Sequence, residues 1–445
     1  MASAESSAAA TAVSAPGKVL LAGGYLVLDR AYTGLVFGLS ARIHVLVQEV
    51  ATGAGLELAQ IDVHSPQFRD ATWTYGYRRA AEQAGVEVTP LQGTSTAPLA
   101  RNPFVETALA YALTYISTQL SSPIPASKVT ILADDDYYSH TSTATLPASP
   151  FTDFGVPLLA AHKTGLGSSA ALVTAFTGAL LTHYLPRSAF TLSAPASRAK
   201  LHNLAQAAHC AAQGKVGSGF DVAAAVYGTC RYRRFSPSVL SLVGKRSAPG
   251  FASRVRELVD DPAQEWDAQI SKNDVTIPPG MALVMCDVDC GSQTVGMVRQ
   301  VLAWRAQRPD EAKRLWDALQ ACNDLLAERL TKGCAVELAE AFLAIRALIK
   351  DMSRESGVPI EPDEQTELLD AVTRGVRGVT GGVVPGAGGY DAVVLLVRDD
   401  EETMGELRRF LEAWREMGRG NVKLLDAKGE LEGAREEDAL TYGRF

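Results

Sequence analysis

Cysteine is scarce in this sequence, with 6 residues among 445. Disulfide scaffolds are far richer in cysteine, so this class is excluded and reduced thiols are expected. Cys286 and Cys290 lie four positions apart, but no histidine cluster or second cysteine pair accompanies them. Buried thiols are therefore favoured over a zinc site at this position.

Long hydrophobic runs and an excess of positive charge are missing as well. Apolar runs such as residues 170–181 fall short of the ~20 residues that span a bilayer. The first basic residue is Lys18, and no apolar signal segment precedes it, so we expect a cytoplasmic protein. A net charge of −8 with a pI of about 5.5 argues against binding to nucleic acid or to an anionic membrane.

The composition is that of an ordinary folded chain, with 47% hydrophobic and 21% charged residues. An Ala/Ser-rich segment over 1–12 predicts a loose N-terminal tail, and a strand is expected over 18–28. A mixture of Pro, Ser and charges over 236–279 suits a linker or excursion between domains. Strand patterns alternate with helical stripes, so we predict an α+β fold with two domains, 1–240 and 241–445.

The segment Lys163-Thr-Gly-Leu-Gly-Ser-Ser-Ala-Ala171 leads directly into an Ala-rich helix. Gly165 and Gly167 permit tight turns, and the N-terminus of a helix attracts phosphate through its free N–H groups and its dipole. The spacing is not that of a Walker A loop. Two interpretations stay open, a phosphate loop and a capped helix that packs closely on a sheet.

A second glycine loop, Gly214-Lys-Val-Gly-Ser-Gly-Phe-Asp221, ends in a carboxylate. On its own it is equally typical of a turn with a capping aspartate. The 67 residues from Phe154 to Phe220 contain no Asp or Glu but do contain five Lys or Arg. A buried Ala-rich region would explain the missing acids but not the basic residues, so we favour a local anion site.

Glycines recur in Gly381-Gly-Val-Val-Pro-Gly-Ala-Gly-Gly-Tyr-Asp391, before an apolar strand. Either a structural hairpin or close approach of the backbone to a ligand fits this pattern. Near the N-terminus, Ser14-Ala-Pro-Gly-Lys-Val-Leu-Leu-Ala-Gly-Gly-Tyr25 contains a lone lysine, Lys18. Such a lysine is more commonly a surface cation than a catalyst.

Taken in chain order, these segments resemble the motifs of the GHMP kinase superfamily. Residues 15–25, 163–171 and 386–392 are similar to its N-terminal, phosphate-loop and C-terminal motifs. Within it, the fungal type of the phosphomevalonate kinase family is most similar, on Gly24–Leu28, Asn102–Glu106, Gln213–Asp221 and Asp287–Thr294. The resemblance implies an N-terminal domain like ribosomal protein S5 domain 2 and a ferredoxin-like C-terminal α/β sandwich domain.

The resemblance also implies an activity. ATP would phosphorylate 5-phosphomevalonate to 5-diphosphomevalonate in the mevalonate route to isoprenoids and sterols, with ATP and Mg²⁺ as cofactors. The enzyme would act alone or as a homodimer. A sister enzyme such as mevalonate kinase or diphosphomevalonate decarboxylase, or a non-catalytic ATP-binding sensor, is the alternative.

Site residues follow from the same resemblance. Lys18 and Asp221 would be catalytic, with Lys18 bridging acceptor and γ-phosphoryl oxygens and Asp221 orienting it or holding the substrate. Nucleotide contacts would come from Lys163, Thr164, Gly165, Leu166, Gly167, Ser168, Ser169, Ala170 and Asn102. Substrate contacts would come from Lys215, Ser218, Gly219, Ser292, Gln293, Thr294, Gly388, Gly389 and Asp391.

Magnesium is the least defined part of this expected site. Ser168 or Ser169 would contact the metal. Related kinases often place a glutamate shortly before the second glycine loop as a metal ligand, whereas this chain has His209-Cys-Ala-Ala-Gln213 there. Mg²⁺ would then rely on phosphates, serine and water.

Overall fold

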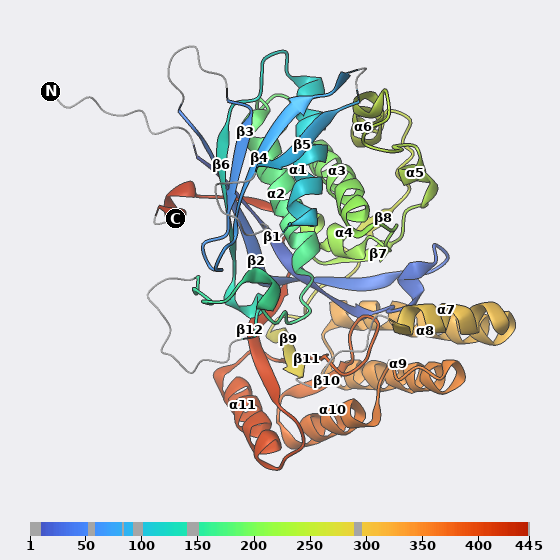
Figure 1. Cartoon of the computed structure of the whole chain (residues 1–445). Coiled ribbons are helices and arrows are strands. Elements are labelled where there is room, and N and C mark those ends of the chain that lie inside the picture. Colours follow the sequence, from blue (N-terminus) through green and yellow to red (C-terminus); the bar gives the residue numbers. More distant parts are fainter. Residues whose placement is uncertain are drawn as a thin grey trace.

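The computed structural model of the chain describes residues 10–51, 58–81, 84–91, 101–139, 151–288 and 296–443. Helices and a large mixed sheet alternate along these ranges, which confirms the predicted α+β class (Figure 1). The strands are β1 (Thr11–Ala22), β2 (Gly34–Glu49), β3 (Gln60–His64), β4 (Thr72–Arg79), β5 (Val86–Leu91), β6 (Ser127–Ala133), β7 (Cys230–Arg233), β8 (Gln269–Ser271), β9 (Met281–Val288), β10 (Val379–Val383), β11 (Ala392–Arg398), β12 (Val422–Glu430) and β13 (Arg435–Glu437).

The helices fall into two sets by length. The long ones are α1 (Pro103–Gln119), α2 (Ser168–Tyr184), α3 (Pro195–Gln213), α7 (Met297–Gln307), α8 (Pro309–Lys332), α9 (Ala335–Ser356), α10 (Asp363–Gly375) and α11 (Glu401–Glu416). The shorter ones are α4 (Phe220–Tyr227), α5 (Ser238–Ser241), α6 (Phe251–Asp260), η1 (Leu26–Leu28), η3 (Asp135–Tyr137), η4 (Leu158–Ala160) and η6 (Ala439–Tyr442).

The main path of the sheet runs β10-β11-β9-β12-β2-β6-β3-β4-β5, and β1 lies antiparallel to β2. In the upper part of Figure 1, helices α1, α2 and α3 pack together on one face of the sheet. Small residues make this close packing possible. Ala171, Ala175 and Ala179 of α2 are fully buried. Their small side chains let the helix approach the sheet closely.

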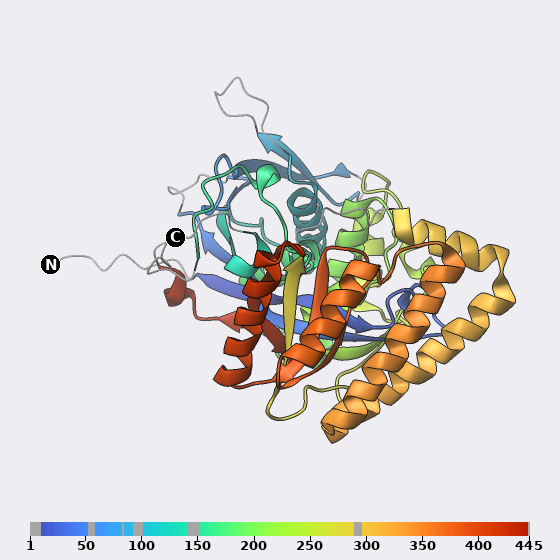
Figure 2. The same cartoon turned by 90° about the horizontal axis from the view of Figure 1, so that it is seen from below.

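A second group of elements lies below it in Figure 1. Strands β9, β10 and β11 join by antiparallel pairing, and α10 and α11 cover one face through Leu369, Val372, Leu407 and Trp414. Helices α8 and α9 pack against each other, as seen from below in Figure 2. Apolar residues at helical spacing are buried along both helices.

The last strands connect the two groups of elements. β12 pairs with β9 at one end and with β2 at the other, and β13 pairs with β1. The buried guanidinium of Arg42 bonds Ser14, the carbonyl of Gly433 and the carboxylate of Glu430. The C-terminal residues therefore return to the N-terminal strands, and the division into 1–240 and 241–445 stays a prediction.

Three local expectations differ from the structure, the first of them at its last residues only, because residues 1–9 of the expected tail lie outside the described residues. Residues 11 and 12 belong to β1, because Thr11 and Ala12 pair with Val47 and Leu46 of β2. The expected strand over 18–28 ends at Ala22, after which Gly23 adopts a positive φ and the short helix η1 follows. Residues 236–279, expected to be a linker or an excursion between domains, include α5, α6 and β8, which excludes only the plain linker.

Within the described ranges, we find no helix long and apolar enough to cross a membrane. The described cysteines, among them the buried Cys286, are free thiols. Cys290 lies outside the described residues.

Asp136, in η3, provides a test of how β12 docks on the N-terminal strands. Its carboxylate accepts the backbone N–H of Asp426 at 2.9 Å, and burial raises its pKa to about 6. The unfolded chain releases this proton near pH 3.8, so the folded state binds more protons between these values and stability falls as pH rises through that window. We expect Asp136→Asn to raise the unfolding free energy by about 1–2 kcal/mol above pH 7 and to have little effect below pH 4.

Chemical denaturation of the variant and of the wild type at both pH values measures this. An equal gain at pH 4 and pH 7.5 would show that the carboxylate charge is not the cause.

Candidate functional site

Lys18 joins the N-terminal motif to the predicted phosphate loop. β1 has a register irregularity between Pro16 and Lys18, and such bulges re-aim side chains. The backbone N–H of Lys18 donates to the carbonyl of Leu166 at 2.9 Å, and its Nζ lies 3.4 Å from the carbonyl of Gly165. A Cβ on Gly167 would lie 2.8 Å from Cε of Lys18, so a larger residue there would have to displace this lysine side chain.

The phosphate loop is held to the rest of the protein by its buried residues. Thr164 is buried, and its hydroxyl donates to the carbonyl of Asp136. Leu166 is also buried, whereas Gly165 and Gly167 take positive φ angles of 77° and 82°. These left-handed conformations favour glycine and turn the chain into α2.

Ser168 and Ser169 begin α2, and no side chain caps this helix end. The first N–H groups of a helix have no partner within it, and the helix dipole places partial positive charge there. The start of α2 is thus suited to phosphate. Ala170 is buried directly behind it.

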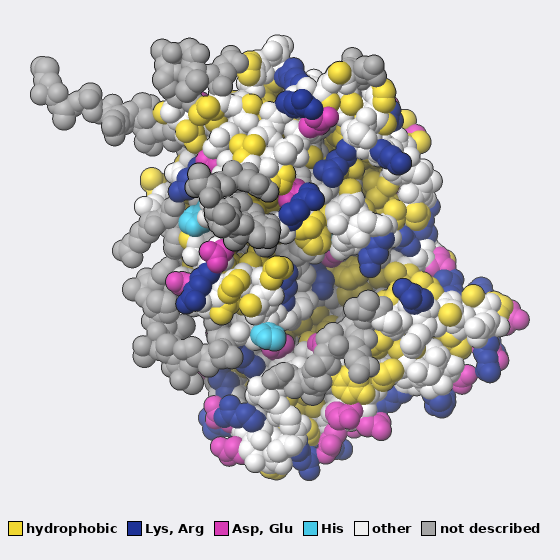
Figure 3. Space-filling view, in the orientation of Figure 1, with side chains coloured by type: hydrophobic (Ala, Val, Ile, Leu, Met, Phe, Trp, Pro, Cys, Tyr) yellow, Lys and Arg dark blue, Asp and Glu magenta, His cyan; other side chains and the backbone are white. Residues whose placement is uncertain are grey.

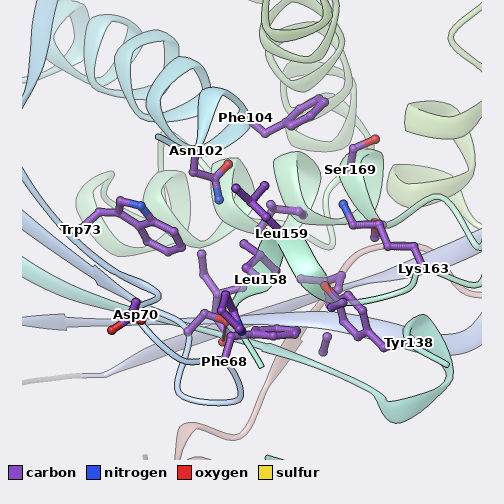
Figure 4. Close-up of a pocket in the computed structure, with 18 of the residues that line it drawn as sticks. Phe68, Asp70, Trp73, Asn102, Phe104, Tyr138, Leu158, Leu159, Lys163 and Ser169 are labelled. Carbon is purple, nitrogen blue, oxygen red and sulfur yellow. Dashed lines mark hydrogen bonds between the residues drawn. The ribbon is translucent and has the colours of Figure 1, made fainter. Parts of the chain in front are cut away.

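A cavity of about 330 Å³ adjoins this helix start. In Figure 4, Ser169 and Lys163 lie at one end of it, and Trp73 and Asp70 lie at the other. Between these ends the walls are mostly apolar. The described lining includes Ile43, Phe68, Asn102, Phe104, Ile131, Ala133, Tyr138, Leu158, Leu159, Ala161, Ser168 and Leu172.

Such a cavity suits a flat apolar group that is attached to phosphates. Of the predicted nucleotide contacts, Lys163, Ser168, Ser169 and Asn102 line it. Asn102 also caps α1 by accepting the N–H of Val105 at 3.3 Å. The sequence did not single out Trp73, Phe68 or Leu158, because they come from separate segments without a shared local pattern.

The second glycine loop lies beside the phosphate loop. Gly219 has a φ of 87° and is enclosed, since a Cβ there would lie 2.7 Å from the Tyr232 hydroxyl. That hydroxyl donates to the carbonyl of Ser218 at 2.8 Å, and Lys215 is exposed. The Tyr232 hydroxyl thus holds the end of the loop in place. The loop leads into α4, where Asp221 lies in the first turn.

Asp221 and Lys18 interact electrostatically. Burial lowers the pKa of Lys18 from its ordinary value, and the charge of Asp221 partly opposes this shift. The Nζ of Lys18 also lies 5.7 Å from the ring centre of Phe220. The structure therefore brings together the two predicted catalytic residues.

The C-terminal glycine motif packs directly on the N-terminal one. The Gly386 N–H donates to the carbonyl of Leu20 at 3.0 Å, and the Tyr25 hydroxyl donates to the carbonyl of Ala387 at 2.7 Å. Gly388 takes a φ of 80° against the carbonyl of Ile360, which also accepts the N–H of Gly389. β1 and the turn after it thus contact both the phosphate loop and the C-terminal motif.

The backbone of Asp391 accepts the N–H of Val288 at 2.8 Å and joins the motif to β9. Ser292, Gln293 and Thr294 lie outside the described residues. Figure 3 shows this face hollowed between the upper and lower parts of the molecule, with apolar, Lys and Arg side chains around the hollow.

The acid-free stretch contributes less charge to the cavity than its composition suggests. Lys163 lines the cavity. Arg187 forms two 2.7 Å bonds with Glu436, and Lys200 pairs with Asp260 at 3.0 Å. These partners come from distant parts of the chain, so the sequence pattern could not reveal them.

The site at the start of α2 offers few protein side chains that could bind a metal ion. In the part of the chain that the structure describes, no group of three or more His, Cys, Asp or Glu is placed to hold an ion. The Ser168 and Ser169 hydroxyls suit Mg²⁺, which keeps waters and binds mainly through nucleotide phosphates. The residues present fit a metal that arrives with the nucleotide.

Comparisons with known proteins agree with this geometry. The family described as "GHMP kinases N terminal domain" matches residues 151–229, which contain both glycine loops of the N-terminal half. Phosphomevalonate kinase ERG8 of Gibberella zeae is 54% identical over 97% of both chains. Phosphomevalonate kinase erg8 of Aspergillus fumigatus is 47% identical over 98% of both.

A more distant relative and a solved structure extend the comparison. The peroxisomal phosphomevalonate kinase of Arabidopsis thaliana is 33% identical over 91% of this chain and 92% of its own. Streptococcus pneumoniae phosphomevalonate kinase, solved with phosphomevalonate and AMPPNP, aligns over 94% of this chain and 99% of its own with a TM-score of 0.61 and 16% identity. The fold is therefore the expected GHMP kinase fold, and the chain belongs to the phosphomevalonate kinase family.

Proposed function

We propose that this chain transfers the γ-phosphoryl group of ATP to the phosphate of 5-phosphomevalonate, giving 5-diphosphomevalonate and ADP. The observation that carries the proposal is the position of Lys18, which lies against Gly165 and Gly167 of the phosphate loop and interacts with Asp221. Membership of the phosphomevalonate kinase family supports the choice of acceptor. A sister activity or a sensor role is not favoured.

The nucleotide would lie in the 330 Å³ cavity with its phosphates at the start of α2. Apolar walls near Trp73 and Phe68 would receive the base, and Lys163 would face the phosphates. Backbone N–H groups at the helix start would contact phosphate oxygens. Mg²⁺ held by the Ser168 or Ser169 hydroxyl would neutralise part of the phosphate charge when bound.

The acceptor determines what Lys18 and Asp221 have to do. A phosphate monoester has a second pKa of about 6, so its attacking oxygen is mostly deprotonated at neutral pH. The chemical difficulty is to bring two polyanions together, which requires cations and positioning more than a base. Lys18 would contact oxygens of both the acceptor and the γ-phosphoryl group, and Asp221 would orient Lys18.

The remaining substrate contacts belong to the same proposal. Ser218, Gly219 and Lys215 would approach the acceptor from one side, and Gly388, Gly389 and Asp391 would approach it from the other. A cytoplasmic location is also part of the proposal, supported by the free thiols of the described cysteines.

Turnover on a panel of acceptors tests the function. We expect purified protein with Mg-ATP to release ADP with 5-phosphomevalonate, and much more slowly with mevalonate or 5-diphosphomevalonate. The physical reason is that the site supplies cations for an acceptor phosphate. A coupled ADP assay on the three compounds measures this, and preference for mevalonate would overturn the proposal.

A further inference from the structure

The ring of His209 lies between the phosphate loop and the second glycine loop. His209 belongs to α3 and is buried, with 2% of the residue exposed. Its Nε2 lies 3.1 Å from Oγ of Ser169, and its Nδ1 lies 3.9 Å from a carboxylate oxygen of Asp221. One imidazole therefore connects the start of α2 with the start of α4.

The neighbours of the ring determine where its proton lies. A carboxylate oxygen can only accept, so the Asp221 oxygen beside Nδ1 favours the neutral tautomer that carries its N–H on Nδ1. In that tautomer the single lone pair of Nε2 faces the Ser169 hydroxyl, which donates to it.

We propose that His209 is a positioning residue that directs the lone pairs of the Ser169 hydroxyl toward the nucleotide cavity. A hydroxyl whose proton is engaged offers a ligand only its lone pairs. A divalent cation takes lone pairs, whereas a phosphate oxygen needs a donor. Ser169 is thereby assigned to the cation that accompanies the nucleotide, and Ser168, which lines the same cavity, is left to donate to phosphate.

The ring is also fixed from a third side. The aromatic ring of Phe104, near the start of α1, lies 5.7 Å from the His209 ring at an interplanar angle of 32°. Phe104 itself lines the nucleotide cavity. Helices α1, α2, α3 and α4 thus all contribute to one arrangement, and His209 is the residue at which they meet.

This inference rests on the proposed function, because it names the nucleotide's cation as the ligand of Ser169. Calorimetric binding of AMPPNP, with Mg²⁺ and separately with EDTA, tests it without an acceptor. We expect Mg²⁺ to strengthen binding to the wild type. In His209→Phe we expect the strengthening of AMPPNP binding by Mg²⁺ to be about 10- to 100-fold smaller than in the wild type. The affinity of this variant for AMPPNP in EDTA is expected to be unchanged.

Ser169→Ala should show the same loss, and the double variant should lose no more than either single variant, because the two residues act through one hydrogen bond. His202→Phe is the matched control. His202 is buried in the same helix, with 3% exposed, and its ring contacts Tyr227 and Trp266 instead. It should retain the full metal-dependent gain.

Two further variants keep the test decisive if His209→Phe does not fold. His209→Gln places an amide oxygen near the position of Nε2 and should retain most of the gain, whereas the shorter His209→Asn reaches only as far as Nδ1 and should lose it. Three results would overturn the inference. The first is a full Mg²⁺-dependent gain in AMPPNP affinity in His209→Phe, and the second is a double variant whose loss is the sum of the His209→Phe and Ser169→Ala losses. The third is an equal gain in His209→Gln and His209→Asn. Metal-dependent AMPPNP binding without turnover of 5-phosphomevalonate would overturn the proposed function alone.

Discussion

Lys18→Ala is expected to lower kcat by about 100- to 1,000-fold with 5-phosphomevalonate as acceptor. The lysine lies where β1 contacts the phosphate loop, and its side chain fills the space that Gly167 leaves open. The three atoms nearest to that space all belong to Lys18, so the substitution removes a positive charge beside the phosphate loop. Asp221→Asn should lower kcat by less, because an acceptor that is already deprotonated needs no base.

Single-turnover kinetics on both variants measure the two losses, with the exposed Lys245→Ala as a matched control for the removal of a lysine. An equal or larger loss in Asp221→Asn would assign a base to the reaction. The pH profile gives a second readout. Since burial lowers the pKa of Lys18, kcat/KM should fall on the alkaline side below the ordinary lysine value of 10.5.

Gly24→Ala is expected to reduce the free energy of unfolding by about 3 kcal/mol or more. A Cβ on Gly24 would lie 2.0 Å from the carbonyl oxygen of Gly386, so either the turn after β1 or the C-terminal motif must move. Neither moves freely, because Gly386 is bonded to Leu20 and Ala387 is bonded to Tyr25.

Denaturant unfolding measures this change, with Gly405→Ala as the matched control. Gly405 lies within α11, and its nearest neighbour to an added Cβ is an Arg409 nitrogen at 3.5 Å. Alanine there should be neutral or stabilising by up to about 1 kcal/mol. Similar effects of the two substitutions would show that the junction of the motifs tolerates displacement.

The sequence predicted the local parts of this site well, because glycine motifs and helix starts are local features. The expected Ala-rich helix directly after the glycines of the phosphate loop agrees with α2, which begins at Ser168. The meeting of Lys18 with Gly167, and of Gly24 with Gly386, involves contacts between distant segments. Only the family resemblance implied that these motifs share one site.

Other features lay beyond prediction for physical reasons. The role of Trp73 in the cavity depends on how β4 pairs with β3, which positions that side chain opposite α1. His209 was noted only for the carboxylate it lacks, and its bond to Ser169 depends on how α3 packs against α2. The length of β1 was misjudged, since pairing with β2 outweighs the weak strand preference of alanine and serine.

The pairing of β13 with β1 also has a consequence for the synthesis of the protein. Ser14 and Glu437, which share a 2.6 Å hydrogen bond, are 423 residues apart in the chain. At about 5–20 residues per second, the ribosome finishes Glu437 roughly 20 to 80 s after Ser14. Throughout that interval one edge of the strand that carries Lys18 lacks its partner. Full assembly of the site therefore follows the end of translation, and a chain stalled before residue 435 would leave that edge open to chaperones and proteases.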